Sequence, residues 1–246
     1  MELRSCLALL FLCLSGGMSY AADAAERQIL GFSPDGRYFA FEQFGVQDGS
    51  GFPYSEIFVI NLDNDRWLDG TPVRVRLEND AQSLGKARDK ALSEARKFLE
   101  QSHIENNGRV LASNPVNQKT ENPQHLVFHS YYTSLGHLEP VDETDQDVIT
   151  LTVEDVVLPT PEACPIGDTP LAGFVLKAKR GAGPFHEVYR DKTIPASRGC
   201  PLKYSLSDAV AYASADGRIQ RLVALVNVFS FGFEGADRRF IAVPVQ

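Results

Sequence analysis

The sequence contains few of the residues that mark specialised classes of protein. Its 246 residues include 4 cysteines, 2 methionines and 1 tryptophan, and 24 basic residues are outnumbered by 32 acidic ones. Four cysteines are too few for a small domain built on disulfides. The formal net charge of -8 provides no basic surplus for contacts with phosphates, so we expect no nucleic-acid partner.

Local motifs of catalysis and cofactor binding are also missing from the sequence. The chain has no G-x-S-x-G, no H-E-x-x-H, no P-loop and no G-x-G-x-x-G that opens a helix. We therefore predict no cofactor and favour a protein without catalytic activity. Catalytic groups assembled from distant residues leave no local motif, so a secreted hydrolase or metal-dependent enzyme is the alternative.

An apolar run near the N-terminus has the layout of a targeting segment. Arg4 precedes the run 6–14, two glycines follow it, and small residues then offer cleavage after Ala21 or Ala24. This order is typical of a cleavable signal peptide, predicted over residues 1–24. A membrane anchor needs about 20 apolar residues, so we expect a periplasmic or extracellular protein with no transmembrane segment after cleavage.

The cysteines divide between this segment and the rest of the chain. Cys6 and Cys13 lie inside it, which leaves Cys164 and Cys200 in the exported protein. An even pair in an oxidising compartment predicts a disulfide bond. The alternatives are a redox pair, which is usually more closely spaced, and a zinc site, which needs two more ligands.

Many short strands are predicted in the rest of the chain. Ile149, Leu151 and Val153 alternate with polar residues, and 222–231 is nearly all apolar, as in a central strand. We predict a mainly β, β-dominated α+β fold, either an antiparallel β-sandwich or partial propeller-like sheets. Strands are expected at 37–42, 56–62, 73–77, 125–132, 148–158, 173–179, 185–191, 204–213, 219–231 and 239–245.

One amphipathic helix is predicted at about 80–102, where apolar residues recur at helical spacing and Asn79 or Asp80 can cap the start. Residues 105–124 are polar and rich in Asn and Pro, which indicates a loop or a domain boundary. We expect an N-terminal β region with the helix at 25–110 and a C-terminal β-rich region at 120–246, or one continuous domain over 25–246.

Residues 31–62 resemble one WD40-like propeller repeat of the TolB type. The segment has a Ser-Pro-Asp-Gly-Arg turn at 33–37, a strand that ends in Ala40-Phe41, and a second strand at 57–62. The whole chain also resembles a bacterial family of predicted secreted proteins of unknown function. That resemblance rests on the start at 33–45, the Ala-rich helix, and the segments Leu111–Pro115, Ser197–Pro201 and Gly232–Val243. It implies secretion and supplies no activity, ligand or catalytic residue.

A glycine-rich loop with aromatic residues is the predicted recognition surface. Phe44, Phe52 and Tyr54 flank Gly45, Gly49 and Gly51. Aromatic rings on a flexible loop suit binding, although Phe52 and Tyr54 could equally pack into the core.

Weak candidates for a metal site are His125, His129 and His137. The first two face the same side of a predicted strand, but residues four apart on a strand are about 13 Å apart, too far for one ion. We therefore predict no metal site there. The acidic runs at 142–147 and at Asp63, Asp65 and Asp69 lack EF-hand spacing, so we interpret them as solvated turns. The sequence favours a secreted, non-catalytic binding or interaction module whose partner is a protein or an envelope component.

Overall fold

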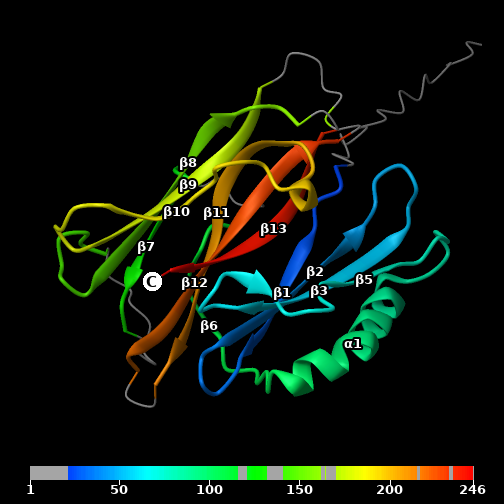
Figure 1. Cartoon of the computed structure of the whole chain (residues 1–246), viewed down its shortest axis with the longest axis horizontal. Coiled ribbons are helices and arrows are strands. Elements are labelled where there is room, and N and C mark those ends of the chain that lie inside the picture. The colour runs from blue at the N-terminus through cyan, green and yellow to red at the C-terminus, as the bar shows by residue number, and fades with distance from the viewer. Residues whose placement is uncertain are drawn as a thin grey trace, which may run out of the picture.

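The computed structural model of the chain describes residues 22–115, 121–131, 141–161, 164, 170–214, 217–232 and 235–245. In this part of the chain the strands form three antiparallel sheets, accompanied by the helix α1 (Leu84–Gln101) and a short 3-10 helix η1 (Ala196–Arg198) (Figure 1). The prediction of a β-dominated fold with one amphipathic helix is confirmed.

The three sheets follow each other along the chain, except that one strand of the last sheet comes early. Sheet I contains β1 (Glu26–Phe32), β2 (Tyr38–Val46), β3 (Pro53–Asn61), β4 (Arg66–Trp67) and β5 (Val73–Arg76). Sheet II contains β7 (His125–His129), β8 (Val148–Leu158), β9 (Leu171–Arg180) and β10 (His186–Arg190). Sheet III contains β6 (Arg109–Ser113), β11 (Pro201–Ala213), β12 (Ile219–Phe231) and β13 (Ala236–Val245).

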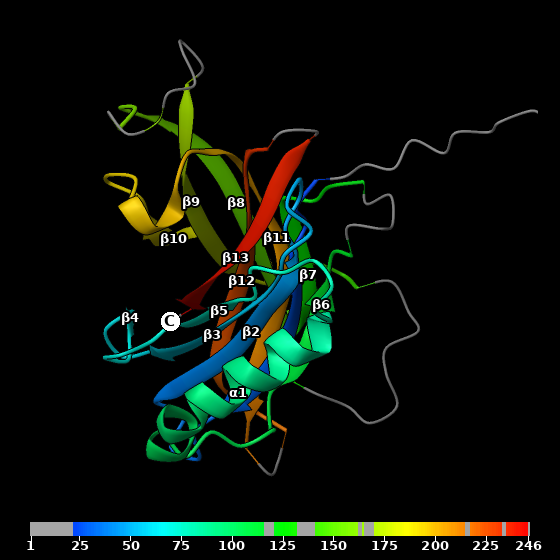
Figure 2. The ribbon, with the colours of Figure 1, turned by 90° about the vertical axis from the view of Figure 1, so that its right-hand side faces the viewer.

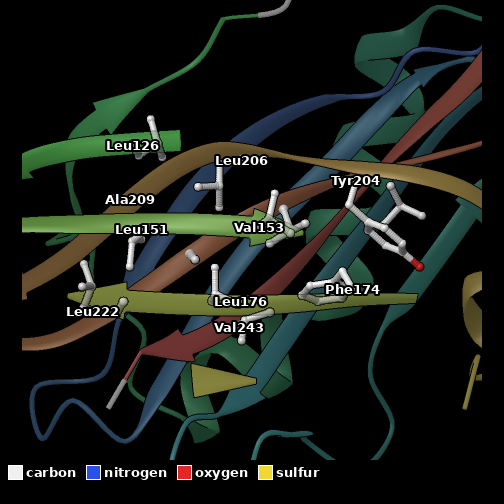
Figure 3. Packing of buried hydrophobic residues seen from close by; sticks show 14 of the residues in the cluster. Leu126, Leu151, Val153, Phe174, Leu176, Tyr204, Leu206, Ala209, Leu222 and Val243 are labelled. Carbon is white, nitrogen blue, oxygen red and sulfur yellow. The ribbon is translucent and has the colours of Figure 1, made fainter. Parts of the chain in front are cut away.

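Sheet III lies between the other two sheets and packs against both. In β12, Leu222 and Ala224 join the core cluster shared with sheet II, whereas Val223 and Leu225 join the cluster shared with sheet I. Successive side chains of a strand point to opposite faces, so β12 must be apolar on both. This explains its almost continuous apolar sequence. Figure 3 shows the core between sheets II and III.

Aromatic rings dominate the core between sheets I and III. Phe41 and Phe58 stack with ring centroids 4.8 Å apart and an angle of 7° between their planes. Phe32, Phe39 and Phe41 have at most 1% of their surface exposed. Each buried aromatic side chain removes a large apolar area from water, so these rings supply much of the stabilisation of sheet I.

Helix α1 covers the other face of sheet I (Figure 2). Its alanines 87, 91 and 95 are fully buried against Ile57 and Val73, and their small side chains let the helix lie close to the sheet. The predicted cap was wrong. The hydroxyl of Ser83, not Asn79 or Asp80, accepts the hydrogen bond from the main-chain N–H of Lys86, because the chain makes a further turn before the helix begins.

The segment 105–124, predicted as a loop or boundary, contains a strand. Arg109–Ser113 forms β6 and pairs antiparallel with β11 at the edge of sheet III. None of its residues is fully buried, which is why the hydrophobic pattern gave no signal. The core cluster at sheet I likewise draws residues from both predicted regions, such as Phe39 and Val210.

The predicted disulfide is confirmed. Cys164 and Cys200 are bonded, with their Cα atoms 5.7 Å apart. They pack with Leu171 and Ile194 in a small apolar cluster. The bond ties the connection between β8 and β9 to the start of β11.

Candidate functional site

A cavity of about 370 Å³ lies where the three sheets meet. Residues of β2 to β5 line it from sheet I, residues of β9 and β10 from sheet II, and residues of β12 and β13 from sheet III. Residues of η1, which follows β10 in the chain, also line it. We call this cavity the junction pocket. Its volume is within the range of about 300–1,000 Å³ that is usual for small-molecule sites.

The floor of the junction pocket is the open edge of β13. The main-chain N–H of Arg238 donates to Asp23 O at 2.9 Å, and that of Phe240 donates to Gln43 Oε1 at 2.9 Å. Because every second residue of an antiparallel strand turns its peptide groups the same way, the N–H and C=O of Ala242 also point away from β12. No described group accepts this N–H, and Ala242 lines the pocket.

Polar side chains of sheet I form one wall. Gln43 donates from its amide nitrogen to Glu56, and Glu56 also accepts a hydrogen bond from Arg74 Nε at 3.0 Å. These contacts fix the positions of both charged groups, because each has a partner that holds its orientation. The wall therefore presents an ordered carboxylate and guanidinium to the cavity.

Aromatic rings lie beside this wall. Trp67 keeps 40% of its surface exposed and meets the buried ring of Phe58 edge-on at 5.8 Å. The guanidinium of Arg74 lies 5.7 Å from the centroid of the indole ring. An exposed tryptophan held by two neighbours is a rigid, partly apolar surface on which a ligand can pack.

The opposite wall is built on a buried arginine. Arg198 has 8% of its side chain exposed and forms an ion pair with Asp191. Its guanidinium also donates to the hydroxyls of Tyr189 and Tyr204, each at 3.3 Å. Burial would lower the pKa of Arg198, but Tyr204, Asp191 and Tyr189 raise it above its usual value, so the group stays charged. Burial raises the pKa of Tyr189 to about 12, so its hydroxyl remains a donor at neutral pH.

Asp65 stands at the mouth of the junction pocket, in the turn before β4. Its backbone has the left-handed φ of 51°, which a non-glycine residue adopts only at some cost. The surrounding walls desolvate the carboxyl and raise the pKa of Asp65, against the opposing charge of Arg198, although the residue keeps an exposed surface. Among the described residues no side chain donates to this carboxyl, so it can accept hydrogen bonds from a ligand.

A buried ion pair lies behind the wall of sheet I. Asp23 accepts hydrogen bonds from Arg239 Nη2 at 2.6 Å and from the Tyr54 hydroxyl at 2.7 Å. Burial raises the pKa of Tyr54, with the charge of Arg239 acting against it. Arg239 also lines the junction pocket, so the segment before β1 helps to position one of the pocket's cations.

The predicted recognition loop has a different neighbourhood from the junction pocket. Phe44 and Tyr54 are 7% and 6% exposed, and Phe52 is half-buried. The guanidinium of Arg88 lies 3.8 Å from the centroid of the Phe44 ring. Two of the three rings therefore have structural contacts, and a recognition role for the loop stays a prediction.

The histidines proposed as weak metal candidates have other neighbours. His125 contacts Thr152 Oγ1 at 3.2 Å and Glu143 Oε1 at 3.3 Å, and the ring of His129 lies 5.4 Å from that of Tyr131. His137 lies outside the described residues. Within the described part of the chain, no group of three or more histidine, cysteine or acidic residues could hold a metal ion.

Sequence reasoning missed the pocket residues Arg74, Tyr189 and Arg198. One signal did point there: the chain's single tryptophan, Trp67, directly follows an acidic turn. We interpreted this turn as solvated, but two of its aspartates have specific surroundings in the structure. Asp63 pairs with Arg37 and Arg221, and Asp65 faces the pocket.

These features define a disulfide-bonded protein of three layered antiparallel sheets with a polar and aromatic pocket at their junction. The arrangement can hold a small polar molecule without requiring any covalent chemistry.

The chain belongs to the family described as "Predicted secreted protein (DUF2259)", whose model matches residues 40–246. The resemblance of residues 31–62 to a propeller repeat is not supported, and the hairpin β2–β3 is part of sheet I. No curated protein matches the chain. Among the described helices, none is long and apolar enough to cross a membrane. The family description and the disulfide both agree with an extracytoplasmic protein.

Proposed function

We propose that this secreted protein is a non-catalytic binding module and that the junction pocket holds its ligand. The observation that carries the proposal is the combination at one cavity of an open strand edge at Ala242, a carboxyl at Asp65 that receives no described hydrogen bond, and an exposed ring at Trp67. Small-molecule sites combine apolar walls with a few placed polar groups in this way.

The ligand class that fits these groups is a saccharide or a similar polyol. Aromatic faces carry negative charge density and pack against the C–H faces of a sugar ring. Its hydroxyls can donate to Asp65 and Glu56 and accept from Arg74 and the Ala242 N–H. A saccharide of the cell envelope is the partner that this chemistry recognises, which specifies the envelope component expected from the sequence.

The experiment uses the intrinsic fluorescence of Trp67 as the probe of binding, because the chain contains 1 tryptophan. The exported protein is titrated with a panel of neutral, amino and acidic mono- and disaccharides while the fluorescence of Trp67 is recorded. A saturable change with at least one sugar supports the proposal, and Asp65→Asn or Arg74→Ala should weaken that sugar's binding about 10-fold. Arg190→Ala is the matched control, since this exposed residue of β10 pairs with Glu187 and does not line the pocket.

A flat response across the whole panel overturns the assignment of a saccharide. Equal binding by the Asp65→Asn, Arg74→Ala and control variants would place the sugar outside the junction pocket.

A secreted glycoside hydrolase is the second candidate. The observation that favours it is that two carboxyl groups line one pocket in different environments: Asp65 has a raised pKa and Glu56 is paired with Arg74. Such a difference assigns the acid and base roles in many hydrolases. Chromatography of the incubated panel tests this, because turnover that disappears in Asp65→Asn would make the protein an enzyme.

The proposal includes export to the periplasm with removal of a leader. Cleavage before Ala22 would keep Asp23 in the exported protein, whereas cleavage after Ala24 would delete it. Asp23 is 3% exposed and bonded to Tyr54 and Arg239. The intact mass of the protein recovered from the periplasm tests this: a chain that starts at Ala22 is expected, and a chain that starts at Ala25 contradicts it.

A further inference from the structure

A second, larger cavity of about 1250 Å³ lies where the last residues of β13 meet sheet II. The ends of β8, β9 and β10, the start of β12 and the turn at Asp63 also line it. We call this cavity the end cleft. It shares β13 with the junction pocket, but Pro244 and Val245 line the end cleft whereas Phe240 to Val243 line the pocket.

The floor of the end cleft is apolar. Leu222 and Ala178 are buried beneath it, and Ile149, Ile219 and Val245 are half-buried along it. These side chains come from sheets II and III and belong to the edge of the core that the two sheets share. Half-buried aliphatic side chains at a cleft are a surface that an apolar ligand can cover.

The walls of the end cleft are cationic. Among the described residues that line it, four carry a fixed positive charge and two are carboxylates, in a chain of formal net charge -8. The cations are Lys179, Arg180, Arg218 and Arg221, and the carboxylates are Asp63 and Asp147. The cleft therefore has the opposite sign to the protein as a whole, and it attracts anions.

Arg180 lines the cleft without an ion pair to any described carboxylate. Arg221 pairs with Asp63 at 3.0 Å and Lys179 with Glu143 at 3.1 Å. The guanidinium of Arg180 instead donates to neutral oxygens, Ser130 Oγ at 3.1 Å and the main-chain oxygen of Gln146 at 3.5 Å. A guanidinium held in this way keeps donors free to bind an oxyanion through two parallel hydrogen bonds.

We propose that the end cleft binds an amphiphilic anion, whose oxyanion head contacts Arg180 and whose apolar body covers the floor at Ile149, Ile219 and Val245. Head and body are both needed, since the cationic wall and the apolar floor belong to one cavity. A phosphate-bearing lipid and a free alkyl anion share this chemistry. This site is separate from the junction pocket and does not depend on the function proposed for it.

Calorimetric titration of the exported protein with n-dodecyl phosphate, below its micelle concentration, tests the proposal. We expect saturable binding at least 10-fold tighter than that of inorganic phosphate, which lacks the body, and of dodecyl maltoside, which lacks the charge. Arg180→Ala should weaken dodecyl phosphate binding about 10-fold or more, the effect of one charge-assisted hydrogen bond. Arg190→Ala, the same charge change on an exposed residue outside the cleft, should leave it unchanged.

Two further measurements identify the source of the ligand and show which cavity binds it. Sedimentation with vesicles of phosphatidylglycerol, and not of phosphatidylcholine, identifies a membrane lipid; binding of the free amphiphile without sedimentation identifies a soluble anion. Trp67→Ala should not change dodecyl phosphate binding. Failure of the end-cleft proposal can therefore be distinguished from failure of the function proposed for the junction pocket. Dodecyl phosphate that binds no tighter than inorganic phosphate, or equally to Arg180→Ala, overturns the proposal.

Discussion

Removing the carboxylate of Asp23 is expected to destabilise the fold strongly, although the residue precedes the first strand. Its side chain is 4% exposed, and Arg239, its partner, is 31% exposed. Breaking a fully buried ion pair costs about 3–5 kcal/mol, and partial solvation of Arg239 places this pair at the lower end. The Tyr54 hydroxyl also loses its acceptor, which costs about 1–3 kcal/mol when the donor stays buried.

Because the exposed part of Arg239 can be solvated after the substitution, these costs do not simply add. We expect Asp23→Ala to lower the free energy of unfolding by roughly 2–4 kcal/mol and the melting temperature by about 5–15 °C. Asp23→Asn keeps an acceptor for Tyr54 and loses the charge, so it should have about half the effect. Urea unfolding followed by the fluorescence of Trp67 measures both variants.

Glu26→Gln is the matched control, because Glu26 is an exposed acid three positions away in β1. Its effect should stay within about 0.5 kcal/mol. If Asp23→Ala unfolds at the same urea concentration as this control, the buried ion pair does not hold the N-terminal segment to β13, and the argument for cleavage before Ala22 also fails.

Three other predictions test separate features. Cys164→Ser with Cys200→Ser should cost about 4 kcal/mol in urea unfolding, given the sequence separation of 36, and equal stability with and without reductant would contradict it. Gly31→Ala should lower the free energy of unfolding by about 3 kcal/mol in the same assay, since φ is 124° and a Cβ would lie 1.8 Å from Glu105 O. Gly49→Ala is the control: it is also at positive φ but has open space around it, so it should lower the free energy of unfolding less. Sugar affinity in the junction pocket should fall as the pH drops through the raised pKa of Asp65, and Asp65→Asn should flatten this profile; an unchanged profile would exclude Asp65 as the acceptor.

The strands that the sequence predicted well are those whose burial follows a simple period. β8 alternates because one face is buried, and β12 is apolar without interruption over 222–226 because both faces are. The helix was recognisable because Ala87, Ala91 and Ala95 repeat every four residues. β6 escaped detection because it lies at a sheet edge with no fully buried residue, so its main-chain pairing with β11 leaves no trace in the hydrophobic pattern.

Neither cavity could be predicted in the same way. The hydrogen bond from Phe240 to Gln43, which helps to form the junction pocket, joins residues separated by 197 positions. The cations of the end cleft come from the end of β9 in sheet II and from the start of β12 and the residue before it in sheet III. The disulfide was predictable because the compartment restricts what two cysteines do. No comparable restriction tells which arginine lies beside which carboxylate before the sheets are packed.

The edge of β13 explains why the junction pocket lies where it does. An open strand edge presents unpaired peptide groups and invites other strands. Along β13 the N–H of Arg238 is taken by the segment at Asp23, that of Phe240 by the side chain of Gln43, and Pro244 has no N–H. Of the outward-facing described N–H groups from Arg238 onward, that of Ala242 remains without an acceptor, between the walls of sheets I and II, where a small ligand can reach it. The N–H groups of this edge are therefore occupied on both sides of Ala242, and its own N–H lies at the floor of the junction pocket.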